Sequence, residues 1–452
     1  MLAKIETILN SSLIKNTLKL SSSSVVLMLI PFIVTPILSR LYTPEDYGVW
    51  GIFSSVLYIV NSFIFLSYEN TIVKSSDDKE LPILIVLCFI ISLSITCLVT
   101  FVFVSGKTIG IPFFVNFHSV PLLATMLLIT ATYNIFNSIA NRNKRYGAMS
   151  VSNIINGSSQ AAIRVFLGKF PIISFGLIVG NIISQLIATI YFIFPLRGFF
   201  KSYSTSRIKV ASIKDLATKY KKFPLYEAPA RFIEFAVLNL TIIILSNYFG
   251  KDEIGHFSMV IQFILLPINV FGSAMGSVYY RELSENFKDP VAITSITQKV
   301  AKITFLISLL PILFLTFGGD KLLVFILGDK WIQAGSMALI MSVFSVPVIL
   351  VQSLLPAFKT LDRQEIRFKL NLLNFALAIG ALIVAAIYYD NINVVLIIYS
   401  IFYALVQFLI YAKILKITNL RLNAVSKYFV LCIFICYLLL LIRIFYSGLL
   451  TY

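Results

Sequence analysis

A few charged residues interrupt the apolar stretches of this chain, and a membrane would have to accommodate their chemistry. The candidates are Arg40, Glu69, Arg164, Glu227, Arg231 and Glu234. A charged side chain inside a bilayer costs about 2.5–3.5 kcal/mol on insertion scales, so it persists mainly where it faces water or a partner. We therefore expect these side chains to line a polar cavity. For Arg40 and Glu69 the alternative is an interfacial position, external and cytoplasmic respectively.

Arg164 extends a polar stripe along one expected helix, residues 148–168. The stripe recurs at spacings of three and four residues and contains Asn153, Asn156, Ser159 and Gln160. A polar face on a membrane-spanning helix points at something other than lipid. A guanidinium and amides on such a face favour Arg164, Asn156 and Gln160 as residues that bind a polar, anionic substrate. The alternative for Arg164 is an anchor at the external end of the helix.

A second polar stripe lies on the expected helix 119–140 and its end. It consists of Asn134, Asn137, Ser138 and Asn141. The stripe leads to Arg142 and Arg145, where an anionic headgroup would arrive from the cytoplasm, so both are candidates for binding it. The alternative is that these arginines only hold the helix end on the cytoplasmic side.

Glu227, Arg231 and Glu234 are spaced by four and then three residues, which places them on one face of a helix that begins near Pro224. An arginine between two carboxylates offsets part of their desolvation, and a partly paired carboxylate can titrate near neutral pH. We expect these residues, with Glu69, to gate the polar cavity or to couple it to an ion gradient, with Glu234 as the titrating group. The alternative is a salt bridge that only stabilises the start of a proline-broken helix.

The elements that must position these residues are membrane-spanning helices. The 452 residues are 58% hydrophobic and 13% charged, and their apolar runs of about 20 residues match the thickness of a bilayer. We expect an all-α polytopic membrane protein with spans near residues 18–38, 49–73, 82–104, 119–140, 148–168, 172–196, 224–249, 255–280, 299–317, 333–357, 368–389, 392–415 and 427–447. The net charge of +17 is spread over short loops, which disfavours nucleic acid as a partner.

The basic residues also predict an orientation. They concentrate in the even-numbered connections, above all between residues 197 and 222, which favours a cytoplasmic N-terminus in the cell (inner or plasma) membrane. The first 20 residues resemble a signal anchor rather than a cleaved peptide. The four cysteines all lie in apolar runs and only two histidines are present, so we expect no metal site. We also expect no cofactor.

One block recurs at an offset of 207 residues without a gap. Leu38-Ser39-Arg40-Leu41-Tyr42-Thr43-Pro44-Glu45-Asp46-Tyr47-Gly48 aligns with Leu245-Ser246-Asn247-Tyr248-Phe249-Gly250-Lys251-Asp252-Glu253-Ile254-Gly255. Each copy follows the first helix of a six-helix half, so the halves are parallel repeats. We expect two six-helix bundles around a central cavity, formed by residues 1–210 and 211–416. Residues 417–452 would add about one C-terminal transmembrane segment.

The stretch Leu38-Ser39-Arg40-Leu41-Tyr42-Thr43-Pro44-Glu45-Asp46-Tyr47-Gly48 resembles the first-loop signature of polysaccharide biosynthesis proteins that flip lipid-linked oligosaccharides. Further resemblances follow in the family's order at Tyr68-Glu69-Asn70, Tyr220-Lys221-Lys222-Phe223-Pro224 and Gly328-Asp329-Lys330-Trp331. The resemblance implies the fold of the multidrug, oligosaccharidyl-lipid and polysaccharide exporter superfamily. It also implies translocation of an undecaprenyl-diphosphate-linked glycan for O-antigen, capsule or a similar polysaccharide. The thirteenth span departs from the usual twelve or fourteen.

Other functions compete with this interpretation. A multidrug or small-metabolite exporter and a lipid II flippase belong to the same superfamily. A membrane glycosyltransferase or polymerase would need a catalytic site in a large external loop, and the longest such loop here, residues 105–118, is short. A phosphate-binding loop of the Walker type does not occur in the sequence. We therefore expect a transporter without catalytic residues, with the lipid bilayer, the lipid-linked oligosaccharide, and glycosyltransferases and polymerase of the same pathway as partners.

Overall fold

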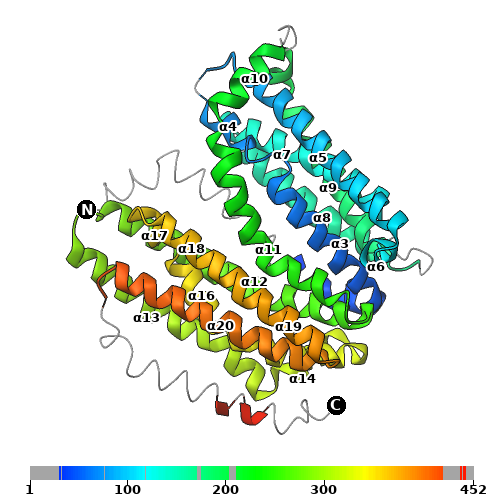
Figure 1. Ribbon diagram of the computed structural model, residues 1–452, viewed down its shortest axis with the longest axis vertical. Helices are drawn as coiled ribbons and strands as arrows, with labels where there is room; N and C mark the ends of the chain where they lie inside the picture. Colours follow the sequence, from blue (N-terminus) through cyan, green and yellow to red (C-terminus); the bar gives the residue numbers. More distant parts are fainter. Residues whose placement is uncertain are drawn as a thin grey trace. The chain divides into compact units, whose positions relative to one another are not determined.

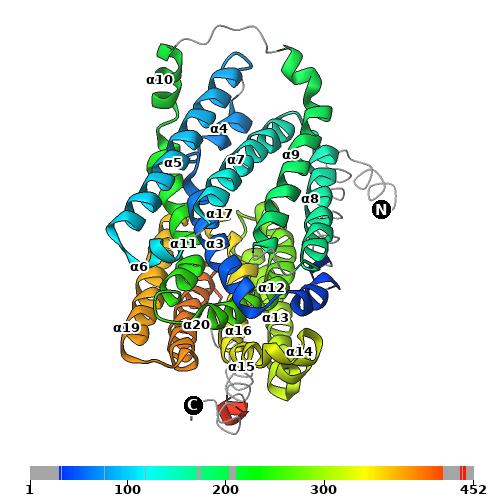
Figure 2. The same cartoon turned by 90° about the vertical axis from the view of Figure 1, so that its right-hand side faces the viewer.

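The computed structural model describes residues 30–31, 33–75, 77–117, 119–170, 175–202, 210–420, 438–439 and 441–443. Every regular element within these ranges is a helix, which confirms the predicted all-α class (Figures 1 and 2). Eight of the described helices are long and apolar enough to cross a membrane. The chain is a multi-pass membrane protein. Most of the predicted spans 18–38 and 427–447, and of the signal anchor, lies outside the described residues.

Contacts divide the chain into two compact units. The first contains Met1–Tyr42 and Ile52–Phe235, and the second contains Thr43–Gly51 and Ala236–Tyr452. The helices α3 and α11 each contribute residues to both units. The expected lobes 1–210 and 211–416, with a further segment at 417–452, stay a prediction.

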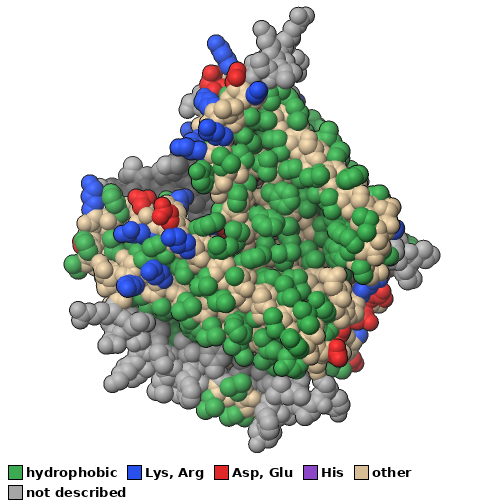
Figure 3. All heavy atoms as spheres, viewed as in Figure 1, with side chains coloured by type: hydrophobic (Ala, Val, Ile, Leu, Met, Phe, Trp, Pro, Cys, Tyr) green, Lys and Arg blue, Asp and Glu red, His purple; other side chains and the backbone are tan. Residues whose placement is uncertain are grey.

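The first unit is built from long helices and short connecting ones. Its elements are α3 (Pro44–Phe63, from residue 52), α4 (Glu69–Lys74), α5 (Leu81–Ile109), α6 (Pro112–Asn116), α7 (Val120–Arg142), α8 (Tyr146–Leu167), α9 (Gly176–Ser202), α10 (Val210–Lys219), the π-helical turn η1 (Phe223–Glu227) and the start of α11 (Ala228–Leu245). The helix α9 packs between α8 and α7, and α7 also packs on α5 (Figures 1 and 2). Hydrophobic side chains cover the visible faces of the helices (Figure 3).

The second unit contains α12 (Lys251–Glu285), α13 (Pro290–Phe314), η2 (Leu315–Gly319), α14 (Asp320–Leu327), η3 (Asp329–Trp331), α15 (Ile332–Met341), η4 (Ser342–Phe344), α16 (Ser345–Leu354), α17 (Pro356–Thr360), α18 (Gln364–Asn374), η5 (Phe375–Ile379), α19 (Gly380–Tyr388) and α20 (Ile392–Ile417). Its centre is α16, which packs against α12, α13 and α20. The core window of the span Asp329–Thr360 is 78% buried, so this helix is shielded by its neighbours.

The second predicted span, residues 49–73, is not one continuous helix. The helix α3 ends at Phe63 and α4 starts at Glu69, with a turn between them. Leu66 and Ser67 take left-handed backbone conformations in this turn, with φ of 49° and 63°. Non-glycine residues rarely adopt such angles, and they are found preferentially at functional sites. The prediction of an unbroken helix was wrong because apolar side chains continue through the break.

The part of the first copy from Thr43 to Gly48 lies against the second copy within the second unit. In each copy an acidic residue reaches back to the start of its helix: Asp46 Oδ2 accepts from the Thr43 amide at 2.8 Å, and Glu253 Oε2 accepts from the Gly250 amide at 3.0 Å. This is half of a capping box, repeated at equivalent positions. Lys251 also pairs with Glu45 at 3.6 Å. Part of the repeated motif therefore specifies how two helices begin.

Candidate functional site

The break between α3 and α4 brings polar residues from two distant helices together in the first unit. Glu69, the first residue of α4, forms an ion pair with Arg231 of α11. The next residue, Asn70, donates from Nδ2 to Glu227 Oε1 at 2.7 Å. Glu227 ends the π-helical turn η1, which runs directly into α11, so the break in the helix lies on the α3–α4 side. Broken helices are where transporters commonly bind ions and substrates.

We call Glu69, Asn70, Glu227 and Arg231 the acidic cluster. The Glu69 side chain is 12% exposed, whereas that of Arg231 is 36% exposed. The second carboxylate oxygen of Glu69 is buried and has no hydrogen-bond partner among the described residues, and the same holds for the Ser67 hydroxyl. Glu69 is thus held in a partly buried ion pair, and Glu227 is held beside it by the amide of Asn70.

The acidic cluster differs in membership from the network that the sequence predicts. Glu234, the third member expected on α11, is exposed. Glu69 and Asn70 of α4 meet the other two instead. Lys74 at the end of α4 lies 5.3 Å from the ring centroid of Phe223, which also ties α4 to η1. Sequence spacing along one helix could not reveal Asn70, because its partner lies 157 residues away.

Arg164 lies on α8 among the buried residues, 9% exposed. Its Nε donates to the carbonyl of Leu177 on α9 at 3.0 Å, and its own carbonyl accepts from the Tyr42 hydroxyl at 2.8 Å. Gly180 of α9 has no side chain, and a Cβ there would press on the Arg164 stem. The guanidinium is therefore built into the packing of α8 against α9.

The rest of the α8 stripe continues this contact with α9. Asn156 donates to Gln185 at 2.7 Å, and Gln160 donates to Asn181. At the N-terminal end of the stripe, Asn153 accepts from the Tyr133 hydroxyl of α7 at 2.7 Å. The polar face of α8 thus meets neighbouring helices rather than lipid. Asn156 and Gln160 are only partly buried.

The two arginines at the end of α7, Arg142 and Arg145, differ in how many contacts they make within the protein. Arg142 donates to the carbonyls of Ile72 and Ser75 and pairs with Asp78 at 2.8 Å. It therefore holds the segment that follows α4. Arg145 is exposed and donates to the carbonyl of Pro195. Arg40 is also exposed.

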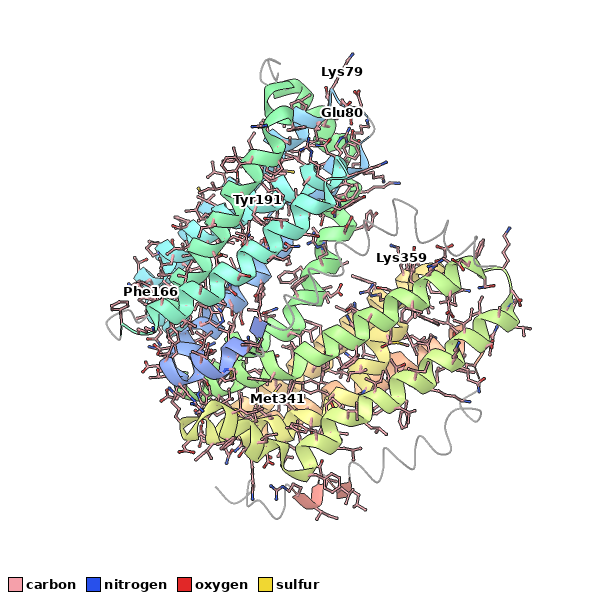
Figure 4. The ribbon with its side chains drawn as sticks, turned by 180° about the vertical axis from the view of Figure 1, so that it is seen from behind. Lys79, Glu80, Phe166, Tyr191, Met341 and Lys359 are labelled. Atoms are coloured by element: carbon pink, nitrogen blue, oxygen red, sulfur yellow. The ribbon has the colours of Figure 1, made fainter. Side chains whose placement is uncertain are left out.

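A further polar cluster, not expected from the sequence, lies beside Lys79 at one end of the first unit, whereas Phe166 lies at the opposite end (Figure 4). Glu80 accepts from the Ser75 hydroxyl at 2.8 Å and the Tyr220 hydroxyl at 2.9 Å, and it pairs with Lys219. Burial by itself raises the pKa of Glu80, but these hydrogen bonds bring it below its usual value. The cluster fastens α10 to the start of α5.

The chain is 24% identical over 344 residues to the capsular polysaccharide biosynthesis protein CapF of Staphylococcus aureus, covering 73% of this chain and 81% of that protein.

Two solved structures share the fold. An inward-facing multidrug resistance MATE family transporter of the MOP superfamily superposes with a TM-score of 0.65 at 14% identity, covering 88% of this chain and 96% of the other. The lipid II flippase MurJ in an inward closed conformation gives 0.64 at 15%, covering 95% and 99%. The fold is therefore that of the superfamily which the sequence resembles. The family described as polysaccharide biosynthesis protein matches residues 37–336, and the chain belongs to this family.

Proposed function

We propose that this protein is a flippase that moves an undecaprenyl-diphosphate-linked oligosaccharide from the cytoplasmic to the external leaflet by alternating access. The proposal rests on the combination, in one chain, of a family match and a shared fold. The family concerns polysaccharide biosynthesis, and the fold is shared with membrane transporters that include a lipid II flippase. The protein would act in the cell membrane with its N-terminus in the cytoplasm. Capsule is the favoured polysaccharide, because CapF is a capsular protein.

We assign different side chains to the different parts of such an amphiphile. Its polyprenyl tail can stay in lipid, whereas its diphosphate and sugars need polar groups along the way. We assign the partly buried amides Asn156 and Gln160 to the glycan and the exposed arginines Arg40 and Arg145 to the headgroup at the two membrane faces. Arg142 and Arg164 act chiefly by positioning, since both donate to main-chain carbonyls.

The acidic cluster is the proposed coupling site. Glu69 has an arginine partner, whereas Glu227 accepts from an amide and lies near the charges of Glu69, Arg231 and Lys74. Binding of a proton or a monovalent cation by a carboxylate would change this balance of charges. We therefore assign the coupling role to Glu69 of α4 and Glu227 of η1, in place of the exposed Glu234. Loss of the bound cation or proton would strengthen the electrostatic attraction between the carboxylates and Arg231. It would thereby favour one conformation of the helices that carry these residues.

The test is a flipping assay with purified protein in liposomes. The liposomes carry an undecaprenyl-diphosphate oligosaccharide with a fluorophore on its glycan, and a membrane-impermeant reductant bleaches the outer leaflet. We expect the protected fluorescence to fall to near zero with the protein present and to remain in protein-free liposomes. Protected fluorescence that persists with every lipid-linked glycan tried would contradict the proposal.

The same liposomes distinguish the alternative functions. Movement of fluorescent lipid II but not of the longer oligosaccharide would identify a lipid II flippase. Uptake of a cationic dye, without movement of either lipid, would identify a multidrug exporter. Both alternatives share the fold, so the choice depends on the cargo that moves.

A further inference from the structure

The π-helical turn η1 begins a membrane span and is bordered by three lysines. The span runs from Phe223 to Leu245, and Lys221 and Lys222 directly precede it. Lys74, at the end of α4, lies over the ring of Phe223. All three lysines are exposed. Because they border the end of an apolar span, they lie at the level where a leaflet presents its phosphates.

These three lysines differ from a neighbouring lysine in lacking a carboxylate partner. Lys219, two residues before Lys221, forms an ion pair with Glu80. Within the described residues no ion pair involves Lys74, Lys221 or Lys222. Their positive charges are therefore available to an anion that arrives from outside the protein.

Two exposed hydrophobic side chains accompany the lysines. Leu225 is 61% exposed and Tyr226 is 73% exposed, and both belong to η1. The start of the turn is held in place, because the ring of Phe223 packs edge-to-face on that of Tyr220, whose hydroxyl donates to Glu80. The turn η1 therefore presents charged and apolar groups together on a fixed support. Helical turns of the π type are rare and often occur at functional sites.

We propose that Lys74, Lys221, Lys222, Leu225 and Tyr226, which we call the η1 rim, capture the diphosphate end of the polyprenyl-linked substrate before it is flipped. This inference rests on the proposed function and names the place where the substrate enters. The segment 197–222, which precedes η1, is predicted to be cytoplasmic, and the substrate is taken up from that side.

The chemistry of the η1 rim matches both parts of such a lipid. The ammonium groups fit the diphosphate as point charges, and the apolar side chains fit the first isoprene units of the tail. Three lysines in one place match a diphosphate better than the single phosphate of an ordinary phospholipid.

The η1 rim also adjoins the acidic cluster. Glu227 is the last residue of η1 and lies within electrostatic reach of Lys74. A diphosphate bound at Lys74 would offset the positive charge that this lysine presents to Glu227. Arrival of the substrate would thus change the electrostatics of the proposed coupling site.

The first test measures equilibrium binding of radiolabelled farnesyl diphosphate, a short polyprenyl diphosphate, to the full-length protein in phosphatidylcholine nanodiscs. Lys221→Gln/Lys222→Gln removes two of the three charges and should weaken binding about tenfold or more. The matched control, Lys144→Gln/Lys214→Gln, removes the same charge from two exposed lysines outside the η1 rim and should leave binding nearly unchanged. Equal weakening in both double variants would reveal an effect of net charge alone and would overturn the site.

A second test concerns the apolar part of the η1 rim. Leu225→Ser/Tyr226→Ser should weaken the binding of farnesyl diphosphate, because the tail loses its contacts. Inorganic diphosphate has no tail, so as a competitor it should bind this variant as well as it binds the wild type. Equal affinity of the variant and the wild type for farnesyl diphosphate would overturn the assignment of the tail to η1.

A third test identifies the occupant. Phosphatidylglycerol is added to the nanodiscs, and binding of farnesyl diphosphate should persist. If phosphatidylglycerol abolished it, the η1 rim would be a site for ordinary anionic phospholipids, and the proposed capture would be overturned. Because binding is measured without transport, failure of this inference is distinguishable from failure of flipping in the liposome assay.

Discussion

Gly48 of α3 and Gly255 of α12 occupy equivalent positions in the repeated block, and each is pressed against the start of the other's helix. A Cβ at Gly48 would overlap the carbonyl of Lys251, and a Cβ at Gly255 would overlap the carbonyl of Pro44. Pro44 and Lys251 are themselves equivalent, since both pairs are 207 residues apart. The crossing is therefore pseudo-symmetric, and the glycines are needed for the close approach of two backbones.

The first prediction concerns this crossing. Gly48→Ala and Gly255→Ala should each destabilise the protein by about 1–3 kcal/mol, because backbone atoms have to move apart. Thermal unfolding in detergent measures the loss. Gly380→Ala is the matched control, since nothing lies within 4 Å of the Cβ it would add to α19. A loss in Gly380→Ala as large as in the other two would contradict the explanation.

The second prediction concerns the acidic cluster. Arg231→Ala should reduce flipping about tenfold, which corresponds to 1.36 kcal/mol, because Glu69 then keeps its charge without a partner. The charge-swapped variant Glu69→Arg/Arg231→Glu should regain part of the activity, since it restores the pair with its signs reversed. Flipping in liposomes is the measurement, with protein level as control. Equal flipping rates for Arg231→Ala and the charge-swapped variant would contradict a functional role of the Glu69–Arg231 ion pair.

The third prediction separates the carboxylates. Glu69→Gln and Glu227→Gln keep the shape of the side chains but cannot titrate, so each should flatten the dependence of flipping on an imposed pH gradient. Glu234→Gln is the matched control on the same helix and should leave this dependence intact. If Glu234→Gln alone abolished the response, the coupling residue would be Glu234, as the sequence spacing suggested.

The fourth prediction concerns Arg164. Arg164→Ala removes the donor to the Leu177 carbonyl and should stop export and lower stability together. Arg164→Lys keeps the charge and loses the planar fork, so it should retain part of both. Export in cells and melting temperature are measured side by side. A variant that stays stable but loses export would assign Arg164 to the cargo rather than to positioning.

The fifth prediction is a pH dependence of stability. Because the folded protein lowers the pKa of Glu80, this residue stabilises the fold above its ordinary pKa. That contribution should disappear as the pH falls through the lowered pKa. Melting curves between pH 7 and about pH 3 should therefore converge for the wild type and Glu80→Gln. A difference that stays constant over this range would exclude Glu80 as its source.

Part of this picture could be predicted from the sequence because it depends on local pattern. Apolar runs indicate the spans, and an offset of 207 residues identifies Gly48 and Gly255 as equivalents. The spacing on α8 correctly indicates a polar face, but spacing cannot tell which helix that face meets. Its partners Asn181 and Gln185 lie on α9.

The rest depends on contacts between distant residues and on backbone breaks. Arg231 pairs with a residue 162 positions away, and a helical wheel of α11 suggests Glu227 or Glu234 instead. The break at Leu66 and Ser67 contains no proline or glycine, so the sequence rules for turns do not predict it. Tertiary packing imposes this conformation.

The burial of α16 has a consequence for how the protein would appear to chemical footprinting. The span Asp329–Thr360 has a mean hydropathy of 2.2 and 78% of its core window buried, whereas Leu81–Ile109 has 2.8 and only 28%. A carbene reagent dissolved in the bilayer should therefore modify α5 heavily and leave α16 almost blank in a mass-spectrometric map. Hydropathy reports which segments a translocon releases into lipid, whereas the folded protein shields most of this apolar span from lipid.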